Sequence, residues 1–434
     1  MFRTGAEVLA TEGFARLLGK RVAVLANPSS LLRVGPGGLR GLPASARQHL
    51  VTALLAAGVD VVRLFGPEHG LWATAQDLIA VEGGDDPVFD RPVSTLYGRT
   101  VDTLTPRPEA LAGIDVLVFD VQDVGARYYT YAATLCMALQ VCAQVGVQVV
   151  VLDRPNPLGG EVIEGNALPE FYRSFVGWID VPQRHGLTVG EIARLYAAEQ
   201  GLAVDLDVVP CAEWNPALYF DEIDFGRAGS PWYAPSPNMP TVTTAVVYPG
   251  GCLVEGTRLS EGRGTTRPFE LIGAPWLDAR RYAEVLQGVG VPGLHVRAMR
   301  FGPTFQKFVG EVCGGVAVEV TERAQFAAVR SGIALLAAAR VLAPQHFAWR
   351  TETYEFVSDR LAIDLLMGGP RAREAIESCA DVADLPAALD QACADFAQGE
   401  RAFAERARAW LLYPRQNGPL AMPAAKARAA GVPV

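Results

Sequence analysis

An acid and an imidazole stand side by side at the end of an apolar run. Residues 59–64 (VDVVRL) predict a buried strand, and FGPEHG follows it, with Glu68 and His69 directly after Gly-Pro. A strand end needs only turn residues. Open α/β sheets bind ligands beyond the carboxyl ends of their strands, so we expect chemistry here. Partial desolvation beside the strand would raise the pKa of Glu68 and suit it to general-acid catalysis.

Five further clusters of functional side chains lie at predicted loop ends. They are FDVQDVGARYYTY (119–131), DRPNPLGG (153–160) with Glu164 soon after, QRHG (183–186), SPNMP (236–240) and LSEGRGTTRPFE (259–270). Each has a structural explanation by itself, such as an ion pair between Asp123 and Arg127 or tyrosines packed in the core. Their convergence on one rim of a parallel sheet favours a shared site.

The residue types in these clusters indicate the kind of ligand. Carboxylates, arginines, amides and aromatic rings occur together, with no evident metal or cofactor motif. Aromatic rings stack on sugar faces, arginines and amides hold hydroxyl and anionic groups, and two carboxyl groups cleave a glycosidic bond. The clusters therefore predict a carbohydrate site.

The elements that must position these side chains alternate between strand and helix. Continuous apolar runs predict strands, and apolar residues at helical spacing predict helices. Thr188 and Glu191 have the spacing of a capping box at a helix start. This pattern predicts a parallel sheet covered by helices on both faces. The expected strands are 21–27, 59–64, 114–121, 147–153 and 202–210, and the expected helices are 45–58, 134–146 and 186–201.

The chain of 434 residues exceeds the usual size of one core, so we expect two domains. The Pro-rich stretch 230–240 is the best linker, and it separates an α/β domain with the parallel sheet (1–232) from a smaller α/β domain (233–414), with an exposed tail at 415–434. The second domain is expected to hold extended segments at 243–257, 294–301 and 314–322, and helices at 277–288, 324–343 and 383–411.

Composition argues against several classes of protein. A net charge of −9 and a pI near 5.2 disfavour a nucleic-acid surface. There is no apolar run of membrane-spanning length and no signal peptide, so we expect a cytoplasmic protein with no membrane partner. The seven cysteines form no C-x-x-C pair and are expected to be buried free thiols.

No cofactor or metal is expected. The segment GVGVPG (288–293) matches the spacing of a dinucleotide loop, but it follows a helix and precedes a strand, which is the reverse of the required order. There is no phosphate loop, and the five histidines are far apart.

The sequence resembles the exo-β-N-acetylmuramidase family. The segments FGPEHG, FDVQDVGARYYTY, DRPNPLGG, RHGLTVGE, SPNMPT and LSEGRGTTRPFELIGAPW carry the resemblance, in this order, and it extends from about residue 20 to Pro414. It implies a Rossmann-like N-terminal domain and a smaller α/β C-terminal domain, with the active site in the cleft between them. It also implies an exo-acting glycoside hydrolase of bacterial cell-wall recycling. The expected reaction releases N-acetylmuramic acid (MurNAc) from the non-reducing end of fragments such as MurNAc-GlcNAc.

Three features depart from the family pattern. Many members carry a secretion signal or lipid anchor, which is not seen here. The stretch GLWATAQDLIAVEGGDDP replaces a glycine-rich segment, and NPSSLLRVG differs from the usual first loop.

Roles follow as hypotheses. Glu68 is the expected general acid, and the second carboxylate is expected among Glu164, Asp123 and Glu261, in that order. Arg154 and Arg263 are expected to bind the lactyl carboxylate of MurNAc, because an arginine fork matches a carboxylate. The other expected substrate-binding residues are His69, Gln122, Arg127, Tyr128, Tyr131, Asn156, His185, Asn238 and Thr265.

Retaining, inverting and substrate-assisted routes all remain open at this point, as does the oligomeric state. The main alternative function is a non-catalytic protein that binds muropeptides or sugars. An amidase or esterase is disfavoured, because there is no serine elbow and no zinc-ligand spacing.

Overall fold

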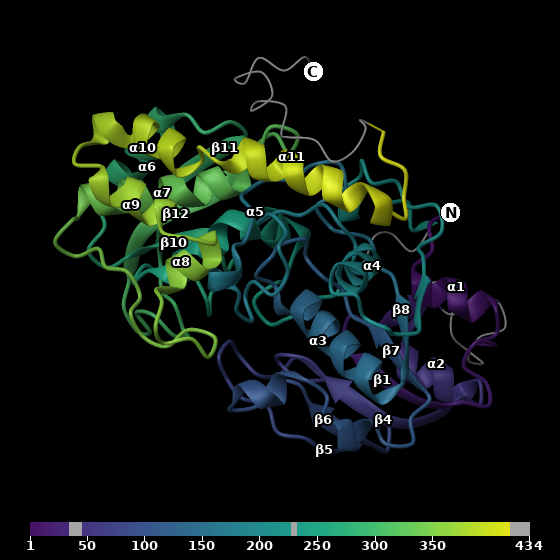
Figure 1. The fold of residues 1–434 in the computed structure, drawn as a ribbon. Coiled ribbons are helices and arrows are strands. Elements are labelled where there is room, and N and C mark those ends of the chain that lie inside the picture. The colour runs from purple at the N-terminus through teal and green to yellow at the C-terminus, as the bar shows by residue number, and fades with distance from the viewer. Residues whose placement is uncertain (34–45, 227–231, 417–434) are drawn as a thin grey trace.

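The computed structural model describes residues 1–33, 46–226 and 232–416. Its N-terminal part is built on a seven-stranded sheet, most of whose strands are labelled in Figure 1. The strand order is β5-β6-β4-β1-β7-β8-β9, and every neighbouring pair is parallel except β5 with β6. The strands are β1 (Arg21–Ala26), β4 (Asp60–Gly66), β5 (Gly84–Asp86), β6 (Arg91–Thr95), β7 (Val116–Asp120), β8 (Gln148–Leu152) and β9 (Leu206–Val209). The strands β2 (Leu31–Arg33) and β3 (Arg47–His49) pair antiparallel in a separate two-stranded sheet.

Helices cover both faces of this sheet, as the sequence predicts. They are α1 (Gly5–Thr11), α2 (Leu50–Ala56), α3 (Thr130–Val145) and α4 (Val189–Glu199). Val22 and Val24 of β1 pack in the core formed with α1 and α2, whereas Ala23 and Leu25 pack in the core formed with α3 and α4. Because each strand is buried on both sides, its sequence is continuously apolar.

The C-terminal part is a three-stranded antiparallel sheet with helices packed around it. The strand order is β10-β12-β11, with β10 (Leu271–Ala274), β11 (Leu294–Phe301) and β12 (Cys313–Val320). The helices are α5 (Val242–Gly251), α6 (Ala279–Val289), α7 (Ala328–Leu342), α8 (Ala362–Met367), α9 (Arg371–Ser378), α10 (Leu385–Ala392) and α11 (Phe396–Ala407). The chain therefore has the two-part α/β architecture that the sequence predicts.

The expected extended segment 243–257 is wrong, because most of it is helix α5. Thr241 caps this helix by accepting a hydrogen bond from the Thr244 amide at 3.0 Å. A side chain at Gly250 would meet the carbonyl oxygen of Ala328 at 1.8 Å, so α5 and α7 are in close backbone contact. A short apolar run that is buried on all sides does not distinguish a helix from a strand by its pattern.

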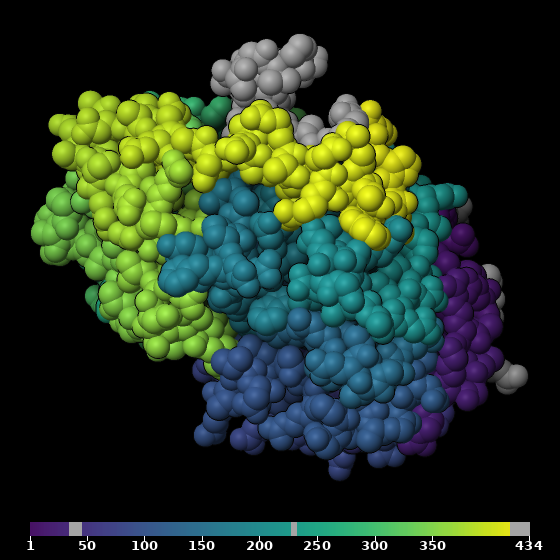
Figure 2. Space-filling model, viewed as in Figure 1, coloured from purple at the N-terminus to yellow at the C-terminus, as the bar shows by residue number. Residues whose placement is uncertain are grey.

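The end of the chain returns to the N-terminal part. Helix α11, yellow in Figures 1 and 2, extends from the C-terminal helices across the N-terminal part. Arg406 of α11 pairs with Asp180 at 2.8 Å and with Glu199 at 2.7 Å. Arg415, expected in the exposed tail, is instead buried and pairs with Glu191 at 2.8 Å. The rest of the expected tail, from residue 417, lies outside the described residues.

Short 3₁₀ helices fill several of the connections. They are η1 (Val101–Leu104), η2 (Pro108–Leu111), η3 (Glu170–Tyr172), η4 (Phe220–Glu222), η6 (Cys252–Gly256), η7 (Val382–Asp384) and η8 (Arg408–Trp410). The seven cysteines are free thiols, six of them buried and Cys393 partly so. Within the described residues, no helix has both the length and the apolar character needed to cross a membrane.

Candidate active site

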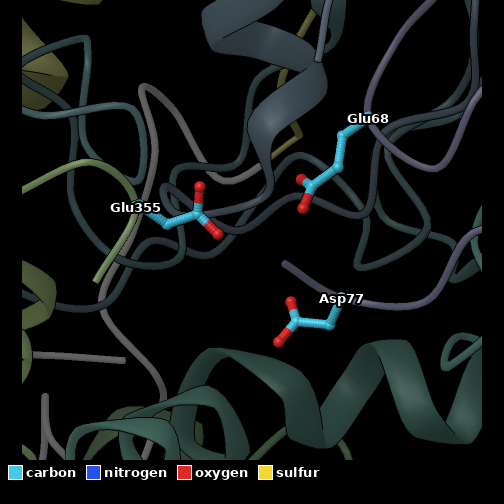
Figure 3. Close-up of side chains that lie close together, drawn as sticks. All are labelled: Glu68, Asp77 and Glu355. Atoms are coloured by element: carbon cyan, nitrogen blue, oxygen red, sulfur yellow. The ribbon is translucent and has the colours of Figure 1, made fainter. Parts of the chain in front are cut away.

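Three acidic side chains from two loops meet in a buried pocket (Figure 3). Glu68 follows strand β4, Asp77 lies in the loop after it, and Glu355 lies in the loop between α7 and α8. One carboxyl oxygen from each lies within 4.8 Å of the others, and the three groups point toward one another. Two halves of the chain thus contribute to one cluster of acids.

The end of β4 holds Glu68 at the first turn of α3. The backbone turns sharply here, because His69 has a φ of 68° and Gly70 a φ of 84°. The hydroxyl of Thr130, the first residue of α3, donates a hydrogen bond to the Glu68 carboxyl group at 2.5 Å. Burial raises the pKa of Glu68, and the charge of Asp77 raises it further, although His69, Thr130 and Arg263 oppose the shift. Glu68 is therefore disposed to keep its proton, as a general acid must.

Asp77 is disposed in the opposite way. Burial disfavours its charged form, but Arg263 at 3.3 Å and the amide of Gln306 at 2.9 Å outweigh burial. The pKa of Asp77 is consequently lowered. Two neighbouring carboxyl groups whose pKa values are pushed apart are the arrangement expected of an acid and a nucleophile or electrostatic stabiliser.

Glu355 is the third acid, and its backbone is unusual. Its φ is 44° and that of Phe356 is 68°, a region that residues other than glycine seldom adopt. The Tyr97 hydroxyl contacts both oxygens of Glu355, at 3.1 and 3.2 Å. Burial, then Glu68 and Asp77, raise the pKa of Glu355 well above its usual value. Strain of this kind is concentrated at functional sites.

Arg263 is the positive centre beside the acids. Its guanidinium pairs with Asp77, with Glu255 at 2.6 Å and with Glu261 at 3.0 Å. It also lies over the ring of Phe269, at 5.1 Å from the centroid. The carboxyl oxygens of Glu68, Asp77 and Glu355 are of the donor type that a hard cation such as Mg²⁺ prefers. However, Arg263 already supplies a fixed positive charge to Asp77, so the group fits acid–base chemistry.

Five of the predicted site residues line this pocket. They are Glu68, His69, Tyr128, Asn238 and Arg263. His69 donates through Nδ1 to the Ala75 carbonyl at 3.0 Å, which braces the loop that carries Asp77. Asn238 donates to the side chain of Gln76 at 2.9 Å. The hydroxyl of Tyr128 bonds to the Pro249 carbonyl, so its ring forms part of the wall.

The structure does not bring the three predicted second carboxylates to the pocket. Glu164 is buried and accepts a hydrogen bond from the Arg330 amide at 3.1 Å. Asp123 accepts from the Gly125 amide at 2.6 Å, with His185 Nε2 at 3.6 Å from the same oxygen. Glu261 is held by Lys307 at 2.8 Å as well as by Arg263. Each of the three has a polar partner, and none of them lines the acid pocket.

Two predicted arginines are also engaged elsewhere. Arg154 forms a two-pronged ion pair with Asp120, at 2.7 and 3.0 Å. Arg127 donates to the carbonyls of Asn166, Val181 and Leu366 at 2.8–2.9 Å, and burial lowers its pKa to about 10. Arg154 lines a different small pocket, together with Gln122, and Arg127 lines neither that pocket nor the acid pocket.

The remaining predicted residues stabilise local structure. Gln122 donates to the carbonyls of Asp123 and Pro155, and Tyr131 donates to the Pro235 carbonyl at 2.7 Å. The side chains of Asn156, His185 and Thr265 each accept a hydrogen bond from an amide two residues further on, as in a turn. A motif rich in polar residues thus contains turn-forming residues as well as residues of the site.

Sequence reasoning missed Asp77 and Glu355. Asp77 lies in the stretch that departs from the family pattern, and no strand end marks its position. Glu355 stands between Tyr354 and Phe356, where an acid among aromatic residues was the one local signal. Glu255, which also lines the pocket, lay in the segment that we expected to be extended.

Comparison with known proteins identifies the family. The family model for the N-terminal domain of exo-beta-N-acetylmuramidase NamZ matches residues 22–243, and the model for its C-terminal domain matches residues 246–413. The peptidoglycan beta-N-acetylmuramidase NamZ of Bacillus subtilis (strain 168) is 37% identical over 401 residues, which is 92% of this chain and 90% of that protein.

Two crystal structures from Bacteroides fragilis NCTC 9343 have the same fold. Both are of DUF1343 family proteins. BF0371 is 29% identical with a TM-score of 0.80, covering 95% of this chain and 99% of that one. BF0379 is 26% identical with a TM-score of 0.67, covering 96% and 100%. The chain therefore belongs to the exo-β-N-acetylmuramidase NamZ family.

Proposed function

We propose that the buried pair of Glu68 and Asp77 is the catalytic centre of an exo-acting β-N-acetylmuramidase. As a member of its family, the chain is a glycoside hydrolase of peptidoglycan. Its substrate would be MurNAc-GlcNAc or a related fragment, with MurNAc released from the non-reducing end, as in cell-wall recycling. The observation that carries this proposal is the opposed pKa shifts of two carboxyl groups within 4.8 Å of each other.

In this mechanism Glu68 protonates the glycosidic oxygen as the bond to the leaving sugar breaks. The ionised Asp77 faces the positive charge that develops on the sugar ring. It acts there either as the nucleophile or by holding the N–H of the 2-acetamido group, whose carbonyl oxygen then attacks the anomeric carbon. After the leaving sugar departs, Glu68 takes a proton from water, which opens the intermediate.

The spacing of the acids favours retention of configuration. Retaining enzymes place their two carboxyl groups about 5–5.5 Å apart, and inverting enzymes about 6.5–9.5 Å apart to admit a water. One oxygen of Glu68 and one of Asp77 lie within 4.8 Å of each other, which is closer to the retaining than to the inverting arrangement. Glu355, with its raised pKa, would keep a proton and could donate it in a hydrogen bond to a substituent of the sugar.

A sugar-binding protein without activity is the weaker alternative. Such a protein would keep aromatic and amide contacts to the ligand. It would have no use for a buried acid held against a second carboxylate, because that arrangement costs folding free energy.

The test is the substitution Glu68→Gln, assayed by release of MurNAc from MurNAc-GlcNAc. We expect a loss of about 100-fold or more in turnover, which is the scale of a lost general acid. Glu82→Gln is the matched control, because Glu82 is exposed at 88% and should leave turnover unchanged. NMR of the wild-type reaction should show the β-anomer of MurNAc first. Near-normal turnover by Glu68→Gln would remove Glu68 from this role.

A further inference from the structure

A cavity of about 400 Å³ adjoins the acid pocket. Its lining includes Leu78, the residue after Asp77, and Gln306, whose amide donates to Asp77 at 2.9 Å. Its volume is in the range of small-molecule sites, whereas the acid pocket by itself has only about 30 Å³ of free space. The part of a substrate that extends beyond the acids therefore has room in this cavity.

Three cationic side chains line the cavity, and two of them are already paired. Lys307 pairs with Glu261 at 2.8 Å, and Arg258, which is 57% exposed, pairs with Glu352. Arg350 forms no salt bridge within the part of the chain that the structure describes. Its one side-chain hydrogen bond there is a long one, 3.5 Å, to the Thr353 carbonyl.

Arg350 also lies close to the acids. The residue is partly buried, and its guanidinium carbon lies 4.9 Å from the ring centroid of Tyr354, a residue that lines the acid pocket. Burial raises the pKa of Asp77, and the charge of Arg263 lowers it most strongly. The charge of Arg350 lowers it too, by a smaller amount. One ligand can therefore contact both Arg350 and the acid pocket.

We propose that Arg350 is the residue that binds the lactyl carboxylate of MurNAc and so selects MurNAc over sugars without this group. The proposal rests on the proposed function. An arginine fork matches a carboxylate through two parallel hydrogen bonds. The arginines expected from the sequence already bind carboxylates of the protein. Arg154 pairs with Asp120, and Arg263 pairs with Asp77, Glu255 and Glu261.

The test compares two chromogenic substrates, a MurNAc glycoside and the methyl ester of its lactyl group, in wild type and Arg350→Met. We expect wild type to prefer the free acid. The variant should lose roughly 10- to 100-fold in kcat/KM on the free acid, mainly through KM, because one charged hydrogen-bond pair is removed. Its rate on the ester should be nearly unchanged. Arg350→Lys should recover part of the preference.

The control is Arg300→Met, which removes the same charge from an exposed position on β11 outside the cavity. It should leave both rates unchanged. An equal loss of Arg350→Met on both substrates, or no loss on either, would overturn the proposal. Wild type with no preference for the free acid would also do so. Failure of the wild-type enzyme to release any MurNAc would instead contradict the proposed function.

Discussion

At the scale of the residue, three buried carboxyl groups this close together cannot all be ionised at neutral pH. Arg263 and Gln306 support a charge on Asp77. Burial and mutual repulsion leave Glu68 and Glu355 with raised pKa values. The groups are coupled, so a pH–rate profile reports the cluster rather than one residue.

Glu355→Gln should therefore stabilise the folded protein, and more so at higher pH. The folded-state pKa of Glu355 lies above its unfolded value, so its contribution to stability is complete below the unfolded pKa and is lost as the pH rises through the folded pKa. A glutamine side chain does not titrate, so the variant does not lose stability in this way as the pH rises. Urea unfolding at about pH 5 and about pH 8 should show the larger gain at the higher pH. An equal gain at both would contradict this assignment.

At the scale of the element, Asp153 joins three segments at the end of β8. It accepts hydrogen bonds from Thr188 at 2.8 Å and Gly190 at 2.9 Å at the start of α4, and from the Tyr413 hydroxyl at 2.5 Å. Burial raises the pKa of Asp153 to about 6, and these hydrogen bonds oppose the shift. The last described segment is thus tied to the sheet through one carboxylate.

Tyr413→Phe should destabilise the protein by about 1–3 kcal/mol, because it leaves buried partners unsatisfied. The folded pKa of Asp153 would rise further above its unfolded value. Stability would consequently be lost with rising pH over a wider range, and the effect of the substitution should be larger at about pH 8 than at about pH 4.5. Urea unfolding at both values measures this. Tyr172→Phe, in the 3₁₀ helix η3, is the control and should change little.

At the scale of the whole molecule, the acid cluster depends on how the two parts of the chain meet. Glu68 and Asp77 come from the N-terminal part and Glu355 from the C-terminal part. Arg127 connects them, because it donates both to N-terminal carbonyls and to the carbonyl of Leu366 in α8. Helix α11 adds a second connection across the top of the molecule in Figure 1.

Arg127→Lys should loosen this junction. A lysine cannot make the same fork of hydrogen bonds, and its ammonium group loses its proton more readily when buried. We expect a loss of roughly 2–4 kcal/mol in unfolding free energy and a lower kcat, since the spacing of Glu355 from the other acids would vary. Urea unfolding and MurNAc release measure the two effects. A variant as stable and active as Arg300→Lys would contradict the connecting role.

Several features were determined by the sequence alone. Continuous apolar runs predicted β1, β4, β7 and β8, and the capping box of Thr188 and Glu191 predicted the start of α4, where both hydrogen bonds of the box are present. FGPEHG placed Glu68 at a strand end, and the order of the motifs indicated the family. These signals are local, because backbone pattern and turn chemistry depend on neighbouring residues.

The partners of Glu68 were decided only by the tertiary structure. A polar residue in a motif forms turns as readily as it serves a site, so Glu164, Asp123 and Glu261 could not be told apart from Asp77 and Glu355 by type or position. What separates them is which distant groups surround each carboxyl group. Glu164 and Asp123 accept hydrogen bonds from backbone amides, and Glu261 pairs with Lys307 and Arg263. In the pocket, burial, Arg263 and the acids themselves set the pKa values of Glu68, Asp77 and Glu355. The energy of a buried charge depends on neighbours in space, and chain order does not specify them.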